Sequence, residues 1–462
     1  MTFEEKRIHV IGIGGIGTSG IARMLLTEGK IVTGSDQAES PVTRSLRQAG
    51  IPVLIPQSAE NIPPDAELVV ISAAIKDDNP ELVEARRRGI PVQKYAKVLG
   101  RLMNERRGIA VSGTHGKTTT TSMIAVTLRR AGLDPSVVVG ATVGPLGGSS
   151  VVGTGEIFVV EACEYDRSFH NLRPHCAVIN NIEEDHLDYY RGGIEEIIAS
   201  FAQFASQVVP EGLLVAKFDD EHVSRAIERA SSRVETFALE SADADWSARG
   251  LRSRHGLYRF HVLYGKRDVG SFELAIPGRH NVSNALAAIG CSHWAGVDFA
   301  VIRESLCDFH GADRRFQVIA EARGVTVVDD YAHHPTKVRE TLQAAREFFG
   351  SRRIFVVFQP HQYSRTRFLL ADFARSFGPA DVVLVPDIFF VRDSESERQQ
   401  VNAADLVRAM KAHGKECYYL ATFAEIEEHL AKRLEKGDVV ITMGAGDVYK
   451  VGQAVARLLE GK

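Results

Sequence analysis

The sequence predicts an α/β protein of three domains, and three observations carry this prediction. Apolar runs typical of strands alternate with helical patterns along nearly the whole chain. Two glycine-rich turns, at 12–17 and 113–116, each stand between an expected strand and an expected helix. A length of 462 residues suits about three domains. We therefore expect a Rossmann-like N-terminal domain at 1–105, a central P-loop α/β domain at 106–313, and a Rossmann-like C-terminal domain at 314–462.

Composition and charge exclude several classes of protein. The formal net charge is −4, so nothing favours nucleic acid or an anionic membrane as a partner. The 5 cysteines have no paired ligand spacing, which argues against a disulfide framework or a zinc site. No apolar run approaches the roughly 18 residues of a membrane helix, and the first residues lack a signal-peptide pattern. We expect a cytoplasmic protein, as a monomer or a homodimer.

The first glycine turn predicts a site for a nucleotide diphosphate. Strands are expected at 8–11, 31–36, 67–72 and 90–92, and the turn follows the first of them as G-x-G-x-x-G. Asp36 lies about 20 residues past the turn, where a ribose-binding acid belongs, so the pattern alone indicates NAD. The same geometry holds any nucleotide diphosphate, including that of a UDP-sugar. The turn residues expected to meet the ligand are Gly12, Gly14, Gly15, Ile16 and Gly17.

The second glycine turn predicts a phosphate loop and makes the central domain one of the P-loop ATPase type. It follows the apolar run 109–112 and opens a helical pattern. Lys117 would reach the β/γ-phosphates of ATP, and the Thr118 hydroxyl would hold Mg²⁺. Val111 stands where the usual pattern has its first glycine, so the loop is a shortened variant. The residues expected to bind ATP here are Gly113, Thr114, His115, Gly116, Lys117, Thr118 and Thr119.

Polar side chains follow the later strands. Glu161 ends the strand 157–161, and His186 follows the strand 176–181, so both should face the phosphate loop from the carboxyl edge of the sheet. An antiparallel hairpin is expected between 257 and 276, and Asn281 and Asn284 share a face of the helix that follows. The last segment has five expected strands, at 325–330, 353–358, 381–385, 417–420 and 438–442. His333 and Arg365 lie just past two of these strands.

Seven stretches in the same order resemble the Mur ligases, the ATP-dependent amide-forming enzymes of peptidoglycan precursor synthesis. The branch most similar to this chain joins L-alanine to UDP-N-acetylmuramate. The resemblance covers essentially the whole chain. The stretches are 9–20, 113–120, 161–166, 181–186, 278–281, 329–335 and 358–365.

The resemblance implies a role for each domain. The N-terminal glycine turn would hold the UDP part of UDP-N-acetylmuramate, with Asp36 and Ser72 nearby. The central domain would bind ATP with Mg²⁺, in two ions: Thr118 and Glu161 would ligate one, and His186 would reach the other. By the same resemblance, His280, Asn281 and Asn284 would hold the adenine and Arg315 would contact phosphate. His333 and Arg365 would lie at the L-alanine substrate.

Two positions depart from the family pattern. Several relatives carry a lysine fifteen residues after the histidine that matches His186, and this chain has Phe201 there. The second metal would then have fewer protein ligands. Gln362 stands where the alanine-adding pattern often has arginine, so we assign it no charge role.

Three alternatives to the alanine-adding ligase follow from the same residues. A recycling ligase would attach a preformed tripeptide to the same sugar nucleotide. An NAD-dependent oxidoreductase would use the first glycine turn and leave Lys117 unexplained. A nucleotide-binding regulator would lack amide chemistry.

Overall fold

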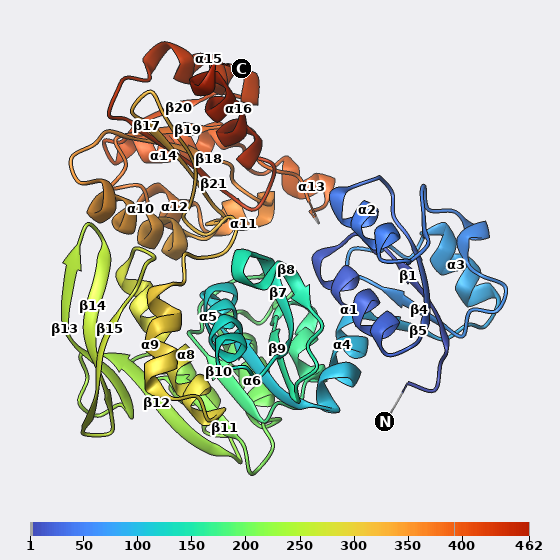
Figure 1. Cartoon of the computed structure of the whole chain (residues 1–462). Helices are drawn as coiled ribbons and strands as arrows, with labels where there is room; N and C mark the ends of the chain where they lie inside the picture. The colour runs from blue at the N-terminus through green and yellow to red at the C-terminus, as the bar shows by residue number, and fades with distance from the viewer. Residues whose placement is uncertain (1–2, 392, 462) are drawn as a thin grey trace.

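The computed structural model describes residues 3–391 and 393–461, which build three separate sheets with helices packed against them (Figure 1). In Figure 1 the central domain, coloured teal to yellow, borders both the blue N-terminal domain and the orange to red C-terminal domain. The predicted three-domain α/β fold is confirmed. Among the described residues, no helix has the length and apolar character needed to cross a membrane.

The N-terminal sheet has five parallel strands. They are β1 (Arg7–Ile11), β2 (Ile31–Ser35), β3 (Val53–Leu54), β4 (Leu68–Ile71) and β5 (Val92–Lys94). Their order is β3-β2-β1-β4-β5, so successive strands are added to one side of β1 and then to the other. Sheets of this kind bind ligands beyond the carboxyl ends of the strands at the point where the strand order reverses. The helices are α1 (Ile16–Thr27), α2 (Pro41–Gln48), α3 (Pro80–Arg87), α4 (Tyr95–Asn104) and the 3₁₀ helix Ala59–Asn61.

The central sheet has ten strands. They are β6 (Arg107–Ser112), β7 (Ser136–Val143), β8 (Gly148–Val151), β9 (Ile157–Glu161), β10 (Cys176–Ile179), β11 (Leu213–Lys217), β12 (Arg233–Leu239), β13 (Trp246–Arg254), β14 (Leu257–Tyr264) and β15 (Arg267–Glu273). β14 and β15 form the expected antiparallel hairpin. The helices are α5 (Lys117–Arg130), α6 (Gly193–Ala205), α7 (Glu221–Ile227), α8 (Arg279–Trp294), α9 (Phe299–Cys307) and the 3₁₀ helices Gly144–Leu146 and Tyr165–Asn171.

Strand β6 shows why the apolar run before the phosphate loop forms a central strand. It pairs with β9 on one side and β10 on the other. Ile109 and Val111 pack into one hydrophobic core, and Ala110 between them packs into the other. Because side chains alternate across a strand, a strand covered on both faces needs apolar residues at every position. This packing fixes the start of the phosphate loop at the carboxyl edge of the sheet.

The C-terminal sheet has six strands, one more than the sequence predicted. They are β16 (Gln317–Ala322), β17 (Val325–Asp330), β18 (Ile354–Phe358), β19 (Val382–Val385), β20 (Glu416–Tyr419) and β21 (Val439–Met443). The expectation of five strands was wrong because β16 is an antiparallel edge strand without a fully buried residue, so it lacks the apolar run of the others. The helices are α10 (Pro335–Phe349), α11 (Tyr363–Phe368), α12 (Leu370–Ala374), α13 (Glu395–Arg398), α14 (Ala403–Ala412), α15 (Phe423–Arg433) and α16 (Tyr449–Glu460).

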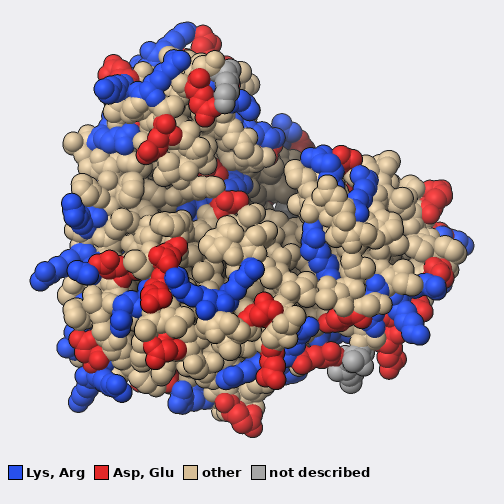
Figure 2. All heavy atoms as spheres, viewed as in Figure 1, with Lys and Arg blue, Asp and Glu red and all other residues tan. Residues whose placement is uncertain are grey.

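The surface is hollowed between the N-terminal and C-terminal domains, above the central domain (Figure 2). Helix α1 of the N-terminal domain packs closely against the central domain, because a Cβ atom added to Gly20 would lie 2.9 Å from the Cβ atom of Ser150. Lys94 and Asp166 form an ion pair of 2.6 Å between the same two domains. The N-terminal domain therefore rests on the central domain and borders the hollow.

Candidate active site

The phosphate loop joins β6 to α5 with two glycines in conformations that favour glycine. Gly113 has φ +134° and Gly116 has φ +81°. A Cβ on Gly116 would lie 2.4 Å from Asn284 Oδ1, so the loop also has no room for a side chain there. No side chain caps α5, which begins at Lys117. Its first backbone amides are thus available to an anion, as at other phosphate-binding helix starts.

Lys117 forms an ion pair with the buried Glu164. Its Nζ lies 2.8 Å from Glu164 Oε2 and donates to the Gly113 carbonyl at 2.6 Å. Burial lowers the pKa of Lys117, but the charge and hydrogen bond of Glu164, together with other nearby acidic groups, outweigh burial and raise that pKa overall. Lys117 therefore stays a positively charged ammonium at neutral pH. Glu164 was not among the residues singled out from the sequence, although it lies in the stretch 161–166.

Glu161, which the sequence singled out instead, lies at the same cavity with a different partner. It ends β9, and its Oε1 accepts a hydrogen bond from the Gly140 backbone amide at 2.6 Å. The carboxylate that the structure pairs with Lys117 is three residues further on. The role of Glu161 at Mg²⁺ stays a prediction, and Glu164 is a second acid of the stretch 161–166 that lines the same cavity.

His186 lies beside Glu164 and completes a set of possible metal ligands. Its Nε2 lies 3.7 Å from Glu164 Oε1, and its buried Nδ1 has no hydrogen-bond partner among the described residues. The residue has φ +53°, a left-handed conformation that points to a local constraint. Carboxylate and hydroxyl oxygens are ligands that Mg²⁺ prefers. Glu164, Thr118 and His186 thus offer a donor set that fits an ion held beside phosphates.

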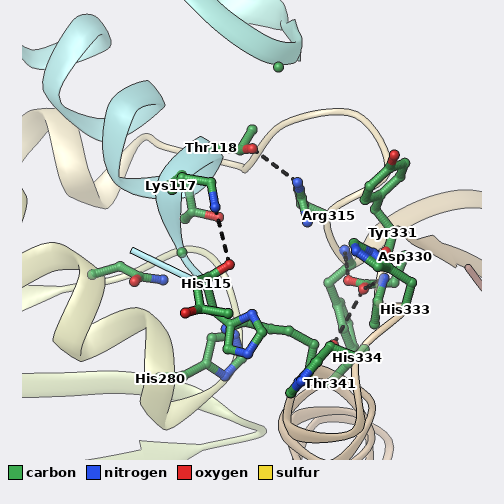
Figure 3. Close-up of a pocket in the computed structure, with 18 of the residues that line it drawn as sticks. His115, Lys117, Thr118, His280, Arg315, Asp330, Tyr331, His333, His334 and Thr341 are labelled. Atoms are coloured by element: carbon green, nitrogen blue, oxygen red, sulfur yellow. Dashed lines mark hydrogen bonds between the residues drawn. The ribbon is translucent and has the colours of Figure 1, made fainter. Parts of the chain in front are cut away.

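The C-terminal domain reaches the phosphate loop through Arg315. Its Nη2 donates to Thr118 Oγ1 at 2.9 Å, and its guanidinium lies 5.1 Å from the centre of the Tyr331 ring. Figure 3 shows Lys117 on α5 and Arg315 on facing sides of the pocket. Two positive charges from two domains therefore flank one space.

His333 lines this space, and Arg365 lies close enough to His333 to interact with it electrostatically. Arg365 donates to Asp185 Oδ1 at 2.7 Å in a pair of which both side chains are more than nine-tenths buried. Burial raises the pKa of Asp185, but the charge of Arg365 together with the neighbouring histidines outweighs burial and holds that pKa well below the ordinary value. His333 Nδ1 lies 2.8 Å from the Tyr331 carbonyl. Burial lowers the pKa of His333, so its imidazole is neutral at pH 7.

The residues expected at the adenine line the side of the cavity at Lys117 that adjoins a second cavity. Asn284 Nδ2 donates to Asn281 Oδ1 at 3.0 Å, and Asn281 Nδ2 donates to the Pro277 carbonyl at 2.7 Å. Burial lowers the pKa of His280 to about 4. His280 and Asn284 line both a cavity of about 690 Å³ and the cavity at Lys117. The two cavities therefore adjoin.

The cavity at Lys117 has a volume of about 340 Å³ and collects most of the residues predicted from the central and C-terminal domains. Two predicted residues do not line the cavity but bond to residues that do. The Gly113 carbonyl accepts a hydrogen bond from Lys117, and Arg365 donates one to Asp185. Predicted residues that line the cavity are Thr114, His115, Gly116, Lys117, Thr118, Thr119, Glu161, His186, His280, Asn281, Asn284, Arg315 and His333.

The N-terminal glycine turn lies apart from the cavity at Lys117. Gly15 precedes α1, which has no side-chain cap, and the Gly14 amide donates to Asp36 Oδ2 at 2.8 Å. Ser72 is close, since a Cβ on Gly12 would lie 3.6 Å from its Oγ. Asp36 therefore orders the turn itself. None of these residues lines the cavity at Lys117.

Comparisons with known proteins cover the whole chain. Three family profiles match: "Mur ligase family, catalytic domain" over 7–107, "Mur ligase middle domain" over 111–292 and "Mur ligase, glutamate ligase domain" over 314–446. The UDP-N-acetylmuramate–L-alanine ligase of Caldanaerobacter subterraneus subsp. tengcongensis is 44% identical over 97% of this chain and 96% of its own.

Two solved structures agree with these matches. The UDP-N-acetylmuramate–alanine ligase of Thermotoga maritima superposes with a TM-score of 0.83 at 30% identity, over 99% of this chain and 100% of the other. The UDP-N-acetylmuramate:L-alanyl-γ-D-glutamyl-meso-diaminopimelate ligase of Neisseria meningitides gives 0.61 at 30% identity, over 67% of this chain and 100% of the other. Full-length similarity at these levels, on a fold with this arrangement of domains, shows that the chain belongs to the Mur ligase family.

Proposed function

We propose that this protein joins L-alanine to the carboxylate of UDP-N-acetylmuramate in peptidoglycan precursor synthesis, with ATP converted to ADP and phosphate. The observation that carries the chemistry is the pair of cations, Lys117 and Arg315, that face one space from two domains. Relatives that are 44% and 30% identical act on this sugar nucleotide and alanine by name. We place the reaction in the cytoplasm.

The chemistry explains why such a space is needed. A carboxylate does not react with an amine in water because it offers no good leaving group, and phosphorylation by ATP supplies one. Bringing a carboxylate to a triphosphate places negative charges side by side, and fixed positive charges stabilise that arrangement. Lys117 and the α5 amides would hold the β/γ-phosphates, and Arg315 would neutralise charge on the transferred phosphoryl group. The amine of L-alanine then attacks the acyl phosphate and releases phosphate.

Mg²⁺ would be held by Thr118 and Glu164, with Glu161 nearby and His186 available to a second ion. The ion supplies charge neutralisation at the phosphates. In this structure Lys117 bonds to Glu164 and Arg315 bonds to Thr118. The protein's own cations therefore occupy these oxygens, and both would turn to phosphate oxygens when the nucleotide binds. Phe201 is buried against Phe169 at 5.2 Å between ring centroids and offers no ligand.

The amino-acid substrate would lie near His333 and Arg365, and the UDP part at the N-terminal turn across the hollow of Figure 2. Water would destroy an acyl phosphate, so the site has to close around it. The central and C-terminal domains already touch through Arg315 and Arg365. Closure would narrow the hollow between the N-terminal and C-terminal domains, and small-angle scattering should record a more compact particle when MgATP and the sugar nucleotide are both added.

A second candidate is ligation of a preformed tripeptide, since the Neisseria meningitides enzyme that joins such a peptide is 30% identical over 67% of this chain. One assay separates the two. The protein is incubated with MgATP, UDP-N-acetylmuramate and either single amino acids or the tripeptide, and ADP and product mass are followed. We expect the mass of the L-alanine adduct. The tripeptide adduct alone would establish the second candidate, and absence of ADP with every acceptor would contradict both.

A further inference from the structure

A second cluster of ligand-type side chains lies where the phosphate loop meets the C-terminal domain. It consists of His115 in the loop, Glu183 after β10, and His334 just before α10 (Figure 3 labels both histidines). Glu183 Oε2 lies 3.5 Å from His115 Nε2 and 3.8 Å from His334 Nδ1. One ligand atom from each residue lies within 4.8 Å of the other two. The three side chains thus converge on one point.

The two histidines present unused nitrogen atoms to that point. Each side chain is 7% exposed, and neither His115 Nε2 nor His334 Nδ1 has a hydrogen-bond partner among the described residues. The other nitrogen of His334, Nε2, lies 3.1 Å from the Glu184 carbonyl, which can only accept a hydrogen bond. The proton therefore belongs on Nε2, and the lone pair of Nδ1 faces the cluster. Metal-binding histidines are oriented in this way by a backbone carbonyl.

We propose that His115, Glu183 and His334 bind a divalent transition metal of the zinc type. Bonds of about 2.0–2.1 Å in a tetrahedral site place ligand atoms roughly 3.3 Å apart. The separations of 3.5 and 3.8 Å from Glu183, and the separation within 4.8 Å between the two histidine nitrogens, would shorten to this value through side-chain shifts. Two imidazoles and one carboxylate suit zinc, whereas Mg²⁺ takes mainly oxygen ligands.

The surroundings of Glu183 support the site. Thr336 Oγ1 donates to Glu183 Oε2 at 2.6 Å and orients the carboxylate. The Glu183 side chain is 36% exposed, which gives a metal a path from solvent and leaves a fourth position for water. The cysteine spacing that argued against a zinc site has no bearing on a cluster of histidines. A metal here would tie the phosphate loop to the C-terminal domain, and this binding does not depend on the ligase reaction.

Cobalt is a suitable probe because tetrahedral Co²⁺ absorbs visible light. The full-length protein is treated with chelator, desalted and titrated with CoCl₂. We expect one equivalent of Co²⁺ to give the tetrahedral absorption, Zn²⁺ to abolish it, and excess Mg²⁺ to leave it. His334→Ala and Glu183→Gln should each weaken Co²⁺ binding at least about tenfold. His334→Cys should restore binding with a shifted spectrum, because a thiolate is also a ligand.

The matched control is His429→Ala. His429 also has a buried ring nitrogen without a hydrogen-bond partner, but it lies on α15 near Tyr418. We expect its Co²⁺ affinity to equal that of the unaltered protein. The proposal is overturned by absence of the absorption, or by equal affinity in His334→Ala and Glu183→Gln. If the absorption persists in His334→Ala and disappears in Glu164→Gln, the metal lies in the cavity at Lys117, and this result also overturns the proposal. Thermal unfolding of each variant confirms that it is folded.

Discussion

The chain repeats one local structure, a strand, a glycine turn and an uncapped helix, in two domains with different surroundings. At the N-terminal turn, the Gly14 amide bonds to Asp36, so an acid orders the loop. At the phosphate loop, Lys117 pairs with Glu164, and Arg315 approaches from another domain. Backbone amides alone suffice to hold a diphosphate. Transfer of a phosphoryl group needs charge that is fixed where negative charge accumulates, and only the second loop has it.

Replacing Lys117 should have the largest effect and should separate the two loops. Lys117→Ala removes the cation from the phosphates, and we expect turnover to fall about 10³-fold or more. Binding of UDP-N-acetylmuramate, measured by calorimetry, should change by less than about twofold, because the N-terminal turn is a separate site. Lys450→Ala, which alters a surface lysine paired with Asp447, is the control. Normal turnover in Lys117→Ala would show that the second loop does not act on phosphate.

The two glutamates of the stretch 161–166 give the next largest effect. Glu164 is paired with Lys117, whereas Glu161 accepts a backbone amide at the rim of the cavity. We expect Glu164→Gln to lower turnover about 10²-fold and to raise the Mg²⁺ concentration needed for half-maximal activity. Glu161→Gln, the matched variant, should lower turnover less than about tenfold. ADP release followed across a Mg²⁺ titration compares them, and the reverse order would restore Glu161 as the main ligand.

Asp36 tests the N-terminal turn, where a smaller change in binding is expected. Asp36→Ala leaves the Gly14 amide without its acceptor, and loss of one such bond corresponds to roughly tenfold in affinity. KM for UDP-N-acetylmuramate should rise by about that factor, while kcat stays unchanged. Steady-state kinetics with saturating ATP gives both values. A fall in kcat at unchanged KM would contradict a purely binding role, and tight binding of labelled NAD by the unaltered protein would support the oxidoreductase alternative.

The smallest expected effect is a pH dependence of the free energy of unfolding, caused by His334 where the phosphate loop meets the C-terminal domain. Burial lowers the pKa of His334 to about 4 from the ordinary 6.5. Between these values the unfolded chain binds a proton that the folded chain does not. Well above pH 6.5 His334 is neutral in both states and does not change the free energy of unfolding. As the pH falls from 6.5 toward 4, the proton bound by the unfolded chain lowers that free energy. Between pH 7 and pH 6 the free energy of unfolding falls by about 0.7 kcal/mol because of His334.

Urea unfolding in chelator-containing buffer checks this sign. His334→Asn should lose about 0.7 kcal/mol less than the unaltered protein between pH 7 and pH 6. His429→Ala serves again as the comparison at a distant histidine. Equal pH dependence in His334→Asn and the unaltered protein would show that His334 titrates normally in the fold.

Local patterns were sufficient for the α/β class, for the strand before and the helix after each glycine turn, and for the hairpin after 257. Strands covered on both faces need apolar runs, and the phosphate loop needs glycines at 113 and 116 for φ values that other residues rarely adopt. Both requirements act between neighbours along the chain, so the sequence alone determined them. The edge strand β16 lacks such a run, and the sequence did not reveal it.

Only the tertiary structure decided which charged groups meet. Arg365 and Asp185 are 180 residues apart, and His115, Glu183 and His334 come from three segments. No periodicity in the sequence encodes such meetings, because they follow from how the C-terminal domain packs on the central one. The choice of Glu164 as the partner of Lys117 has the same origin. It depends on the path of the chain after β9, where a difference of three residues turns a side chain toward a different neighbour.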